Sequence, residues 1–201
     1  SVSAEVTLVE DGAPRSVIVR SDRRERLEPQ LEDFQLTAAG EIVEHLQLMT
    51  GAKLEVVDDG EVPEGMLPIY LGGAADPALD ALSRAAGVNP STFTLRVRKD
   101  RVDIRGLSDE GTLFGVYELL EQLGFRWYMP GEVGRVVPDG DTARIEVQEE
   151  TQAPTMQMRI LQKIGIDWPW ARRARLGGEK RSTGAHGIPG LPRNQEAFDE
   201  N

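Results

Sequence analysis

The sequence predicts an α+β domain in which a mixed β-sheet carries two main helices packed on one face. Short apolar runs bounded by Gly, Pro and Asp recur through residues 1–150 and are typical of strands. Two longer stretches place apolar residues at helical spacing, and no internal repeat or low-complexity tract interrupts the pattern. We therefore expect strands and hairpins covered by a single layer of two long helices.

The first elements are an expected hairpin and the first long helix. Residues 4–9 alternate weakly, residues 16–20 hold three adjacent β-branched side chains, and Asp11-Gly12 between them indicates a turn. From residue 29 the spacing becomes helical, and Gly51 is placed to end the helix. The expected buried stripe of this helix is Phe34, Ala38, Ile42, Leu46 and Met49.

The middle of the chain predicts two buried strands, a short helix and a hairpin. Residues 53–57 and 68–71 are short apolar runs of the kind found in buried strands. Residues 75–86 indicate a small helix that ends at Gly87. Residues 93–97 and 102–105 alternate on either side of Lys99-Asp100, which predicts a hairpin.

The second long helix has the strongest signal. Ser108 is a natural N-cap, and Gly124 stops the chain. Its expected apolar face is Leu113, Val116, Tyr117, Leu120 and Leu123. Gly111 and Gly115 are expected to let this helix lie close to the sheet, the alternative being backbone contact with a ligand. Residues 125–128 and 133–137 then predict two strands around Pro130-Gly131, and residues 144–147 a further strand.

Charge and composition exclude several classes of protein. The net charge of −11 disfavours a nucleic-acid partner, because phosphate backbones are neutralised by clustered Lys and Arg. Cysteine is absent, so disulfides, thiolate nucleophiles and Cys-based zinc sites are excluded, and only His45 and His186 supply imidazoles. No apolar run of about 18 residues predicts a membrane span, and the start at Ser1 lacks a signal-peptide pattern, as a trimmed secreted chain also would.

The most specific stretch is GTLFGVYELLEQLGFRWYMPGEVG at residues 111–134, followed by Val137-Pro138. With Leu-Met-Thr-Gly-Ala ending residues 38–52 and Tyr-Leu-Gly in residues 69–72, it resembles the second domain of multidomain glycoside hydrolases. The resemblance covers residues 30–165. It is nearest to the alpha-glucuronidase-like enzymes and to a bacterial family called domain of unknown function 4838. It implies a hexosaminidase domain-2-like fold that holds no catalytic residue and precedes a (β/α)8 barrel.

The resemblance also implies a division of the chain. Residues 1–150 would be the accessory α/β domain, and residues 151–201 a linker with the first strand and helix of a truncated barrel. The charge shifts at nearly the same point: residues 1–154 carry 15 basic and 29 acidic groups, whereas residues 155–201 carry 8 and 5. Residues 154–161 alternate as a first barrel strand should, with Met156, Met158 and Ile160 on one side.

Candidate binding residues follow from this resemblance. An arginine near the first barrel strand reaches the sugar in hexosaminidase-like relatives, which makes Arg159 a candidate substrate contact, the alternative being a pair with a carboxylate. His186 resembles a loop histidine of those relatives, with a plain surface loop as the alternative, and Trp168 completes the substrate-binding set. Arg126, Trp127 and Tyr128 are expected to form an interdomain surface, unless Trp127 is simply core.

No catalytic residue, cofactor or metal site is expected. A (β/α)8 barrel needs about 250 residues, and only 47 follow Pro154. Glycoside hydrolysis uses two carboxylates across the scissile bond, and no acidic pair here has a reason to converge. The Gly177–Thr183 stretch has the wrong spacing for a phosphate loop. Arg172, Arg173 and Arg175 are expected on a solvated helix face opposite Ala171, Ala174 and Leu176, an acidic-sugar clamp being the alternative.

These observations predict a non-catalytic N-terminal accessory domain of a carbohydrate-active enzyme. The alternative is a free-standing carbohydrate-binding or structural interaction module. The expected partner is the remainder of the parent enzyme, with carbohydrate as a further candidate and neither nucleic acid nor membrane. Residues beyond Thr155 would expose an unpaired strand edge, which favours self-association. The resemblance favours an extracellular or periplasmic location.

Overall fold

A six-stranded mixed sheet runs through the centre of the molecule. The structure is a computed structural model that describes residues 4–21, 33–58, 60–159 and 167–178. The strand order is β11-β6-β7-β5-β3-β4, in which β4, β3, β5 and β7 are parallel and β6 is antiparallel to both β7 and β11. The strands are β3 (Ser16–Arg20), β4 (Val56–Asp58), β5 (Leu67–Leu71), β6 (Phe93–Val97), β7 (Val102–Gly106) and β11 (Gln148–Gln152).

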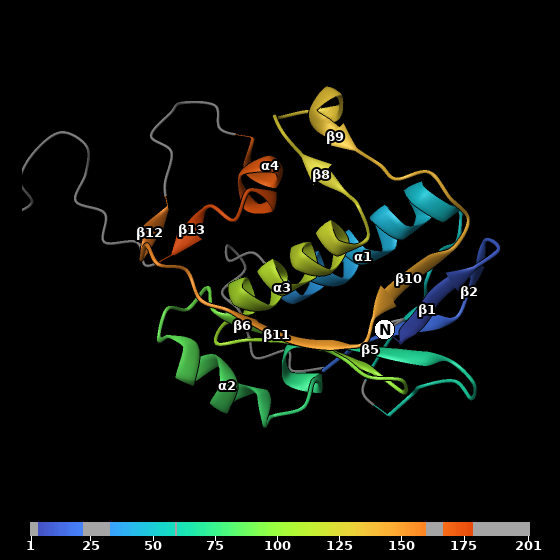
Figure 1. The fold of residues 1–201 in the computed structure, drawn as a ribbon, viewed down its shortest axis with the longest axis horizontal. Helices are drawn as coiled ribbons and strands as arrows, with labels where there is room; N and C mark the ends of the chain where they lie inside the picture. The colour runs from blue at the N-terminus through green and yellow to red at the C-terminus, as the bar shows by residue number, and fades with distance from the viewer. Residues whose placement is uncertain (1–3, 22–32, 59, 160–166, 179–201) are drawn as a thin grey trace, which may run out of the picture.

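Helices cover both faces of this sheet. The two long helices, α1 (Phe34–Thr50) and α3 (Asp109–Gln122), lie side by side on one face, as predicted (Figure 1). The short helix α2 (Leu79–Ala86) lies on the other face, so the prediction of a single helical layer is wrong. Polar contacts connect α2 to the sheet: the Ser83 and Thr94 hydroxyls lie 2.9 Å apart, and Arg105 Nε donates to Asp80 Oδ1 over 2.6 Å.

The opening hairpin has a different partner from the one predicted. β1 (Glu5–Glu10) turns at Asp11 and Gly12, both with positive φ, and pairs with the two-residue strand β2 (Ala13–Pro14). β3 instead joins the six-stranded sheet beside β5. The reason is its burial: Val17, Ile18 and Val19 are each 0% exposed, and a strand buried on both faces belongs inside a helix-covered sheet.

The remaining strands complete the edges of the fold. β10 (Ala143–Glu146) confirms the strand predicted at residues 144–147 and pairs with β1. The chain then enters β11, a strand of the six-stranded sheet that was not predicted. β8 (Arg126–Trp127) and β9 (Arg135–Val136) form the predicted hairpin, with a 3-10 turn, η2, at Glu132–Gly134. α2 confirms the helix expected at residues 75–86 and its end at Gly87, but it begins only at Leu79. A second 3-10 turn, η1 (Gly72–Ala74), precedes it.

Beyond β11 the structure describes three short elements. β12 (Met158–Arg159) pairs antiparallel with β13 (Gly177–Gly178), and α4 (Trp168–Arg173) lies between them in the sequence. Residues 160 and 161, the end of the expected first barrel strand, lie outside the described residues. No described helix combines the length and the hydropathy that crossing a membrane would need.

Local signals in the sequence account for both long helices. The Asp33 carboxylate caps α1 by accepting from the backbone N–H groups of Gln35 and Leu36 over 3.0 and 2.9 Å. Gly51, with φ of 78°, ends α1 in the left-handed conformation. Ser108 Oγ caps α3 by accepting from Gly111 N over 3.1 Å. α1 begins at Phe34, and residue 29, where the helical spacing begins in the sequence, lies outside the described residues.

The two α3 glycines confirm the predicted close packing. A Cβ added at Gly111 would lie 2.6 Å from the Thr92 carbonyl oxygen, and one at Gly115 would lie 2.5 Å from Ile104 Cγ2. Real Cβ atoms do not approach so closely, so α3 sits on the sheet at a distance that only glycine permits at these positions.

Replacing Asp33 with Ala should lower the free energy of unfolding by about 1 kcal/mol, because two α1 N–H groups lose their acceptor. Asp33→Asn is the matched control, since its amide oxygen can still accept from the same groups. Urea unfolding followed by circular dichroism measures both variants. Equal losses for the two would show that the cap bond contributes nothing.

Candidate functional site

Residues 167–178, here called the docking segment, return to the domain after β11. Within this segment α4 contacts α3 on the side of that helix opposite the sheet, next to the β8–β9 hairpin (Figure 1). Asp167 caps α4 by accepting from Trp170 N over 2.9 Å, and Pro169 occupies an early position where its missing N–H costs nothing. The docking segment is therefore a structured return of the chain onto the two long helices.

The first anchor of this segment is an ion pair between Arg173 and Glu41 of α1. Arg173 Nε donates to Glu41 Oε2 over 3.1 Å, and Nη2 donates to Oε1 over 3.0 Å. The Tyr117 hydroxyl donates to the same Oε1 over 3.4 Å. Glu41 is only 8% exposed, and burial raises the pKa of its carboxyl although Arg173 opposes this shift. Two-point pairing of this kind fixes orientation as well as position.

His45 lies one helical turn beyond Glu41 and is fully buried. Its Nδ1 lies 2.8 Å from the Glu41 carbonyl oxygen and 3.3 Å from Glu41 Oε2, while Nε2 has no hydrogen-bond partner in the described structure. Phe125 and Trp127 contact the imidazole edge-on, with ring centroids 5.1 and 5.3 Å away. Burial lowers the pKa of His45 to about 4, so the ring is neutral at pH 7.

This buried imidazole predicts a loss of stability in mild acid. A histidine of the unfolded chain has a pKa near 6.5, so as the pH falls from 6.5 toward 4 the unfolded state takes up the proton first. From pH 7 to pH 5, this should cost on the order of 2 kcal/mol of unfolding free energy. His45→Phe keeps a ring in the cluster but cannot titrate. Urea unfolding at both pH values should show a smaller loss in the variant, and equal losses would contradict the prediction.

Trp127 joins the aromatic cluster to the docking segment. Its ring is half-buried and contacts Tyr117 as well as His45, and the Arg173 guanidinium carbon lies 5.8 Å from its ring centroid. Trp170 Nε1 donates to the Trp127 carbonyl oxygen over 3.1 Å. Trp127 thus packs against the core and also contacts the docking segment. Its neighbour Tyr128 is 72% exposed.

The second anchor is formed by Arg175. Its Nη2 donates to Glu118 Oε2 and to Glu121 Oε2, each over 2.6 Å, and its Nη1 donates to Gln152 Oε1 over 3.0 Å. Burial acts to raise the pKa of Glu118, but hydrogen bonds from Gln122, Arg175 and Gln152 outweigh it and lower that pKa. Burial raises the pKa of Glu121. The two carboxylates are used to hold one guanidinium.

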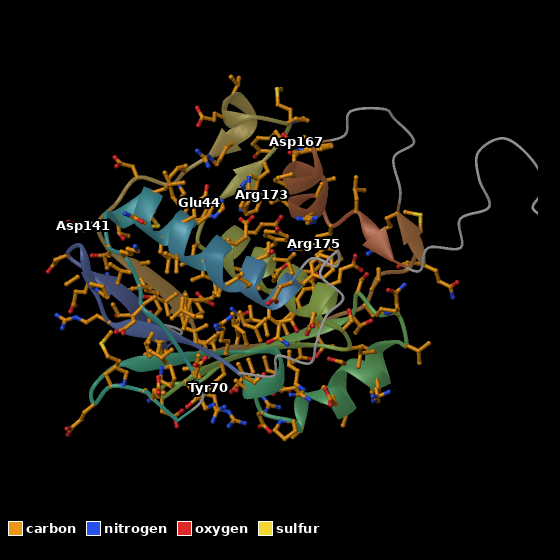
Figure 2. All side chains as sticks on the ribbon, turned by 180° about the vertical axis from the view of Figure 1, so that it is seen from behind. Glu44, Tyr70, Asp141, Asp167, Arg173 and Arg175 are labelled. Atoms are coloured by element: carbon orange, nitrogen blue, oxygen red, sulfur yellow. The ribbon has the colours of Figure 1, made fainter. Side chains whose placement is uncertain are left out.

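These anchors correct two expectations from the sequence. Arg173 and Arg175 are paired against the domain rather than spread on a solvated face, because the domain presents one buried and two half-buried carboxylates to them (Figure 2). Ala171 is buried as expected, whereas Ala174 is exposed. The convergence of Glu118 and Glu121 was also missed, although their three-residue spacing on one helix is a signal for it.

Of the three predicted substrate contacts, the structure describes only the side chain of Arg159. Arg159 donates from Nε to the Arg175 carbonyl oxygen and from Nη1 to the Met156 carbonyl oxygen, each over 2.8 Å. The charge of Glu110 acts on Arg159, which lines a cavity of about 200 Å³ together with Arg175. His186 lies outside the described residues, and so does the side chain of Trp168.

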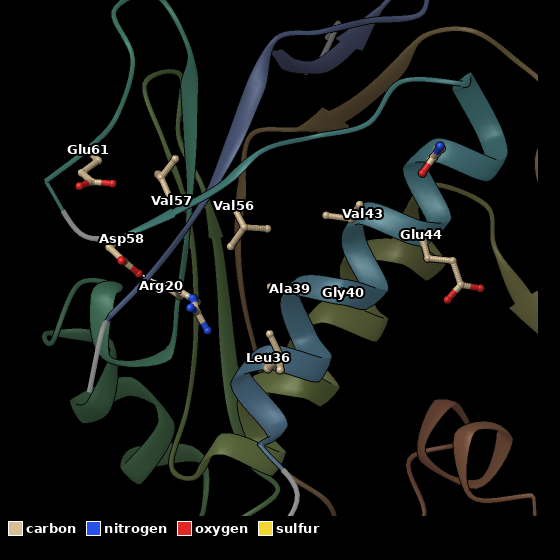
Figure 3. Close-up of a pocket in the computed structure, with 11 residues that line it drawn as sticks. Arg20, Leu36, Ala39, Gly40, Val43, Glu44, Val56, Val57, Asp58 and Glu61 are labelled. Atoms are coloured by element: carbon tan, nitrogen blue, oxygen red, sulfur yellow. Dashed lines mark ion pairs between the residues drawn. The ribbon is translucent and has the colours of Figure 1, made fainter. Parts of the chain in front are cut away.

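Two further cavities flank the long helices. A smaller one of about 170 Å³, here called the junction cavity, lies between the β8–β9 hairpin and the docking segment, and its walls include Trp127, Met129, Glu132, Asp167, Pro169 and Trp170. A larger groove of about 540 Å³ lies between α1 and the edge strand β4. Figure 3 shows Leu36 and Val43 on α1 facing Val56 on β4, with Arg20 beside Asp58.

Among the described residues, no group of three or more His, Asp or Glu side chains gathers where it could hold a metal ion. The carboxylates that hold the docking segment are Glu41, Glu118 and Glu121, and each is bound to an arginine. The chemistry this arrangement supports is the fixing of one chain segment on another.

Comparison with known proteins finds relatives by structure alone. No protein-family model and no curated protein matches the chain. A family GH115 4-O-methyl-alpha-glucuronidase with specificity for decorated arabinogalactans superposes with a TM-score of 0.51 at 19% identity over 77% of this chain. The GH20 exo beta-N-acetylglucosaminidase of Vibrio harveyi gives 0.44 at 14% over 78%, and the chitobiase of Flavobacterium johnsoniae 0.44 at 14% over 79%.

The matched region is a small part of each of those proteins. The chain spans 19% of the glucuronidase, 18% of the acetylglucosaminidase and 20% of the chitobiase. An α+β fold similar to the one described above thus occurs as a part of the GH115 glucuronidase.

Proposed function

We propose that this chain is a non-catalytic accessory domain of a glycoside hydrolase, and that it fixes the start of the domain that follows it. The observation that carries this proposal is the double anchoring of the docking segment. Arg173 and Arg175 tie residues 167–178 to α1 and α3 through three acidic side chains. A chain leaving a domain through such anchors has a defined direction, which is what the placement of a second domain requires.

The carboxylates of the domain support a positioning role rather than catalysis. An acid and a base for glycoside hydrolysis must face each other across a bound sugar. Glu41, Glu118 and Glu121 instead each accept from an arginine at 2.6–3.0 Å. Releasing Glu41 would leave the Arg173 guanidinium without its partner, at a cost of roughly 3–5 kcal/mol for a buried pair.

The β8–β9 hairpin offers a surface for the following domain. Exposed apolar side chains gather on it: Tyr128, Met129, Val133 and Val136, with Val133 94% exposed. Apolar groups gathered in this way are typical of interaction sites. The domain that follows the docking segment is the occupant we propose, with Arg126 and Tyr128 on the contact surface beside Trp127.

The finer features of the proposal rest on the sequence resemblance. They are an alpha-glucuronidase-like parent, a (β/α)8 barrel that begins within residues 151–201, and substrate contacts from Arg159, Trp168 and His186. The first of these, an alpha-glucuronidase-like parent, is supported by the similar fold of the GH115 glucuronidase. The matched region is only 19% of that enzyme, which has specificity for decorated arabinogalactans.

Two measurements test the proposed function. The reading frame beyond Asn201 should encode the strands and carboxylates of a barrel, and a chain extended into it should hydrolyse aryl glycosides. The 201-residue chain should give no turnover with the same substrates. Turnover by the short chain that disappears on substitution of one of its carboxylates would contradict the proposal, as would a stop codon directly after Asn201.

A further inference from the structure

The ring of Trp170 in the junction cavity has no aromatic partner among the described residues. Trp170 lines the cavity and is half-buried. Its indole N–H is used by the Trp127 carbonyl, but in the described structure the ring has no stacking, edge or cation contact. An aromatic surface of this size normally packs on something, so the cavity beside it is a place for a flat or apolar ligand face.

Two side chains that line the cavity, Asp167 and Arg173, each have a polar atom without a hydrogen-bond partner among the described residues. Asp167 Oδ1 accepts from Trp170 N, but no described group donates to Oδ2. Arg173 uses Nε and Nη2 for Glu41, and its Nη1 has no described acceptor. One free acceptor and one free donor on the same cavity suit hydroxyl groups, which both donate and accept.

We propose that the junction cavity binds a single neutral pyranose ring, the end of a saccharide chain, with the ring on Trp170 and hydroxyls on Asp167 and Arg173. The C–H groups on one face of a pyranose pack on an indole, while its equatorial hydroxyls reach outward to polar side chains. The volume of about 170 Å³ is well below the roughly 300–1,000 Å³ of drug-sized pockets, which limits the occupant to about one ring.

The charges of the site select a neutral sugar over a uronic acid. Both guanidiniums of the cavity are already neutralised, Arg173 by Glu41 and Arg135 by Glu44 at 3.1 Å. Asp167 and Glu132 add negative charge to the walls. A sugar carboxylate would therefore meet like charge without an unpaired cation to offset it.

This binding goes beyond the proposed function, because it needs only residues of the described chain and no catalysis. It would give the accessory domain a saccharide contact of its own at the junction. Its test is independent of turnover, so the saccharide site can fail while the accessory role stands, and the accessory role can fail while the site stands.

Tryptophan fluorescence reports on this site selectively, because all three tryptophans, Trp127, Trp168 and Trp170, belong to β8 or α4. The full 201-residue chain is titrated with methyl xyloside, methyl glucoside and methyl galactoside, and with sodium glucuronate. At least one neutral glycoside should give a saturable change with a Kd of about millimolar, as expected for one ring. Glucuronate should bind at least tenfold more weakly.

Three variants locate the binding. Asp167→Asn keeps the oxygen that caps α4 but loses the charge, and Trp170→Ala removes the ring; each should weaken binding about tenfold. Tyr128→Ala is the matched control, because Tyr128 is an exposed aromatic on the β8–β9 hairpin that does not line the cavity, and it should leave the Kd within twofold. Circular dichroism confirms that each variant folds. No saturable change up to 50 mM, tighter binding of glucuronate, or unaltered binding by both site variants would each overturn the proposal.

Discussion

Replacing Arg173 with Met is expected to lower the free energy of unfolding by about 3 kcal/mol, because it leaves the buried Glu41 carboxylate without its cation. The loss of one partner from a buried pair costs about 3–5 kcal/mol. We expect the lower end of that range, since Glu41 regains water once the docking segment detaches. Urea unfolding measures the total loss, and hydrogen exchange of residues 167–178 measures the detachment.

Two comparisons separate the buried charge from general effects of losing an arginine. Arg15→Met removes the 3.1 Å pair with Glu10, in which the side chains are 55% and 40% exposed, and should cost less than about 1 kcal/mol. Adding Glu41→Gln to Arg173→Met should recover part of the stability, because no charge is then left buried. If Arg173→Met costs no more than Arg15→Met and leaves exchange unchanged, the first anchor does not hold the segment.

Elements with a local cause could be predicted from the sequence. Asp11-Gly12, Gly51, Ser108 and Gly124 each act within a few residues, through a positive φ or a capping oxygen, and the structure has a turn or helix end at each of them. The β6–β7 hairpin is equally local, with Val97 paired to Val102 across its turn. Such signals need no knowledge of the rest of the fold.

The pairing of the strands and the position of α2 could not be predicted from the pattern of apolar residues within each strand. Residues 16–20 are a strand in both the prediction and the structure, but the choice of β5 over β1 as partner comes from burial on both faces. The position of α2 was missed for a related reason: Thr94 and Arg105 look like solvent-facing strand residues until Ser83 and Asp80 are placed opposite them.

The candidate site could be predicted only in part, because its contacts join residues far apart in the chain. Glu41 and Arg173 are separated by 132 positions, and Glu118 and Arg175 by 57. Trp127 was identified as a boundary residue from its own chemistry. Nothing local indicated that Arg173 and Arg175 would pair with acidic side chains of the domain, since a lone arginine is expected to be solvated unless its acceptor is known.

Gly111→Ala is expected to destabilise the protein by about 2–3 kcal/mol, although alanine is the better helix former. The added Cβ would lie 2.6 Å from the Thr92 carbonyl oxygen and 2.7 Å from that of Pro90. Both are backbone atoms, so no side chain can rotate to make room, and α3 must move away from β6 as a whole. Thermal and urea unfolding should show the loss.

Gly40→Ala supplies the matched comparison within the other long helix. Gly40 is exposed in α1, and a Cβ there would meet no atom within 4 Å. The same substitution should therefore stabilise the protein by roughly 0.5–1 kcal/mol, the ordinary preference of a helix interior for alanine. Opposite signs for the two variants would establish that contact with the sheet, and not helix propensity, requires glycine at position 111. If Gly111→Ala were also stabilising, α3 could not lie as close to β6 as the structure places it.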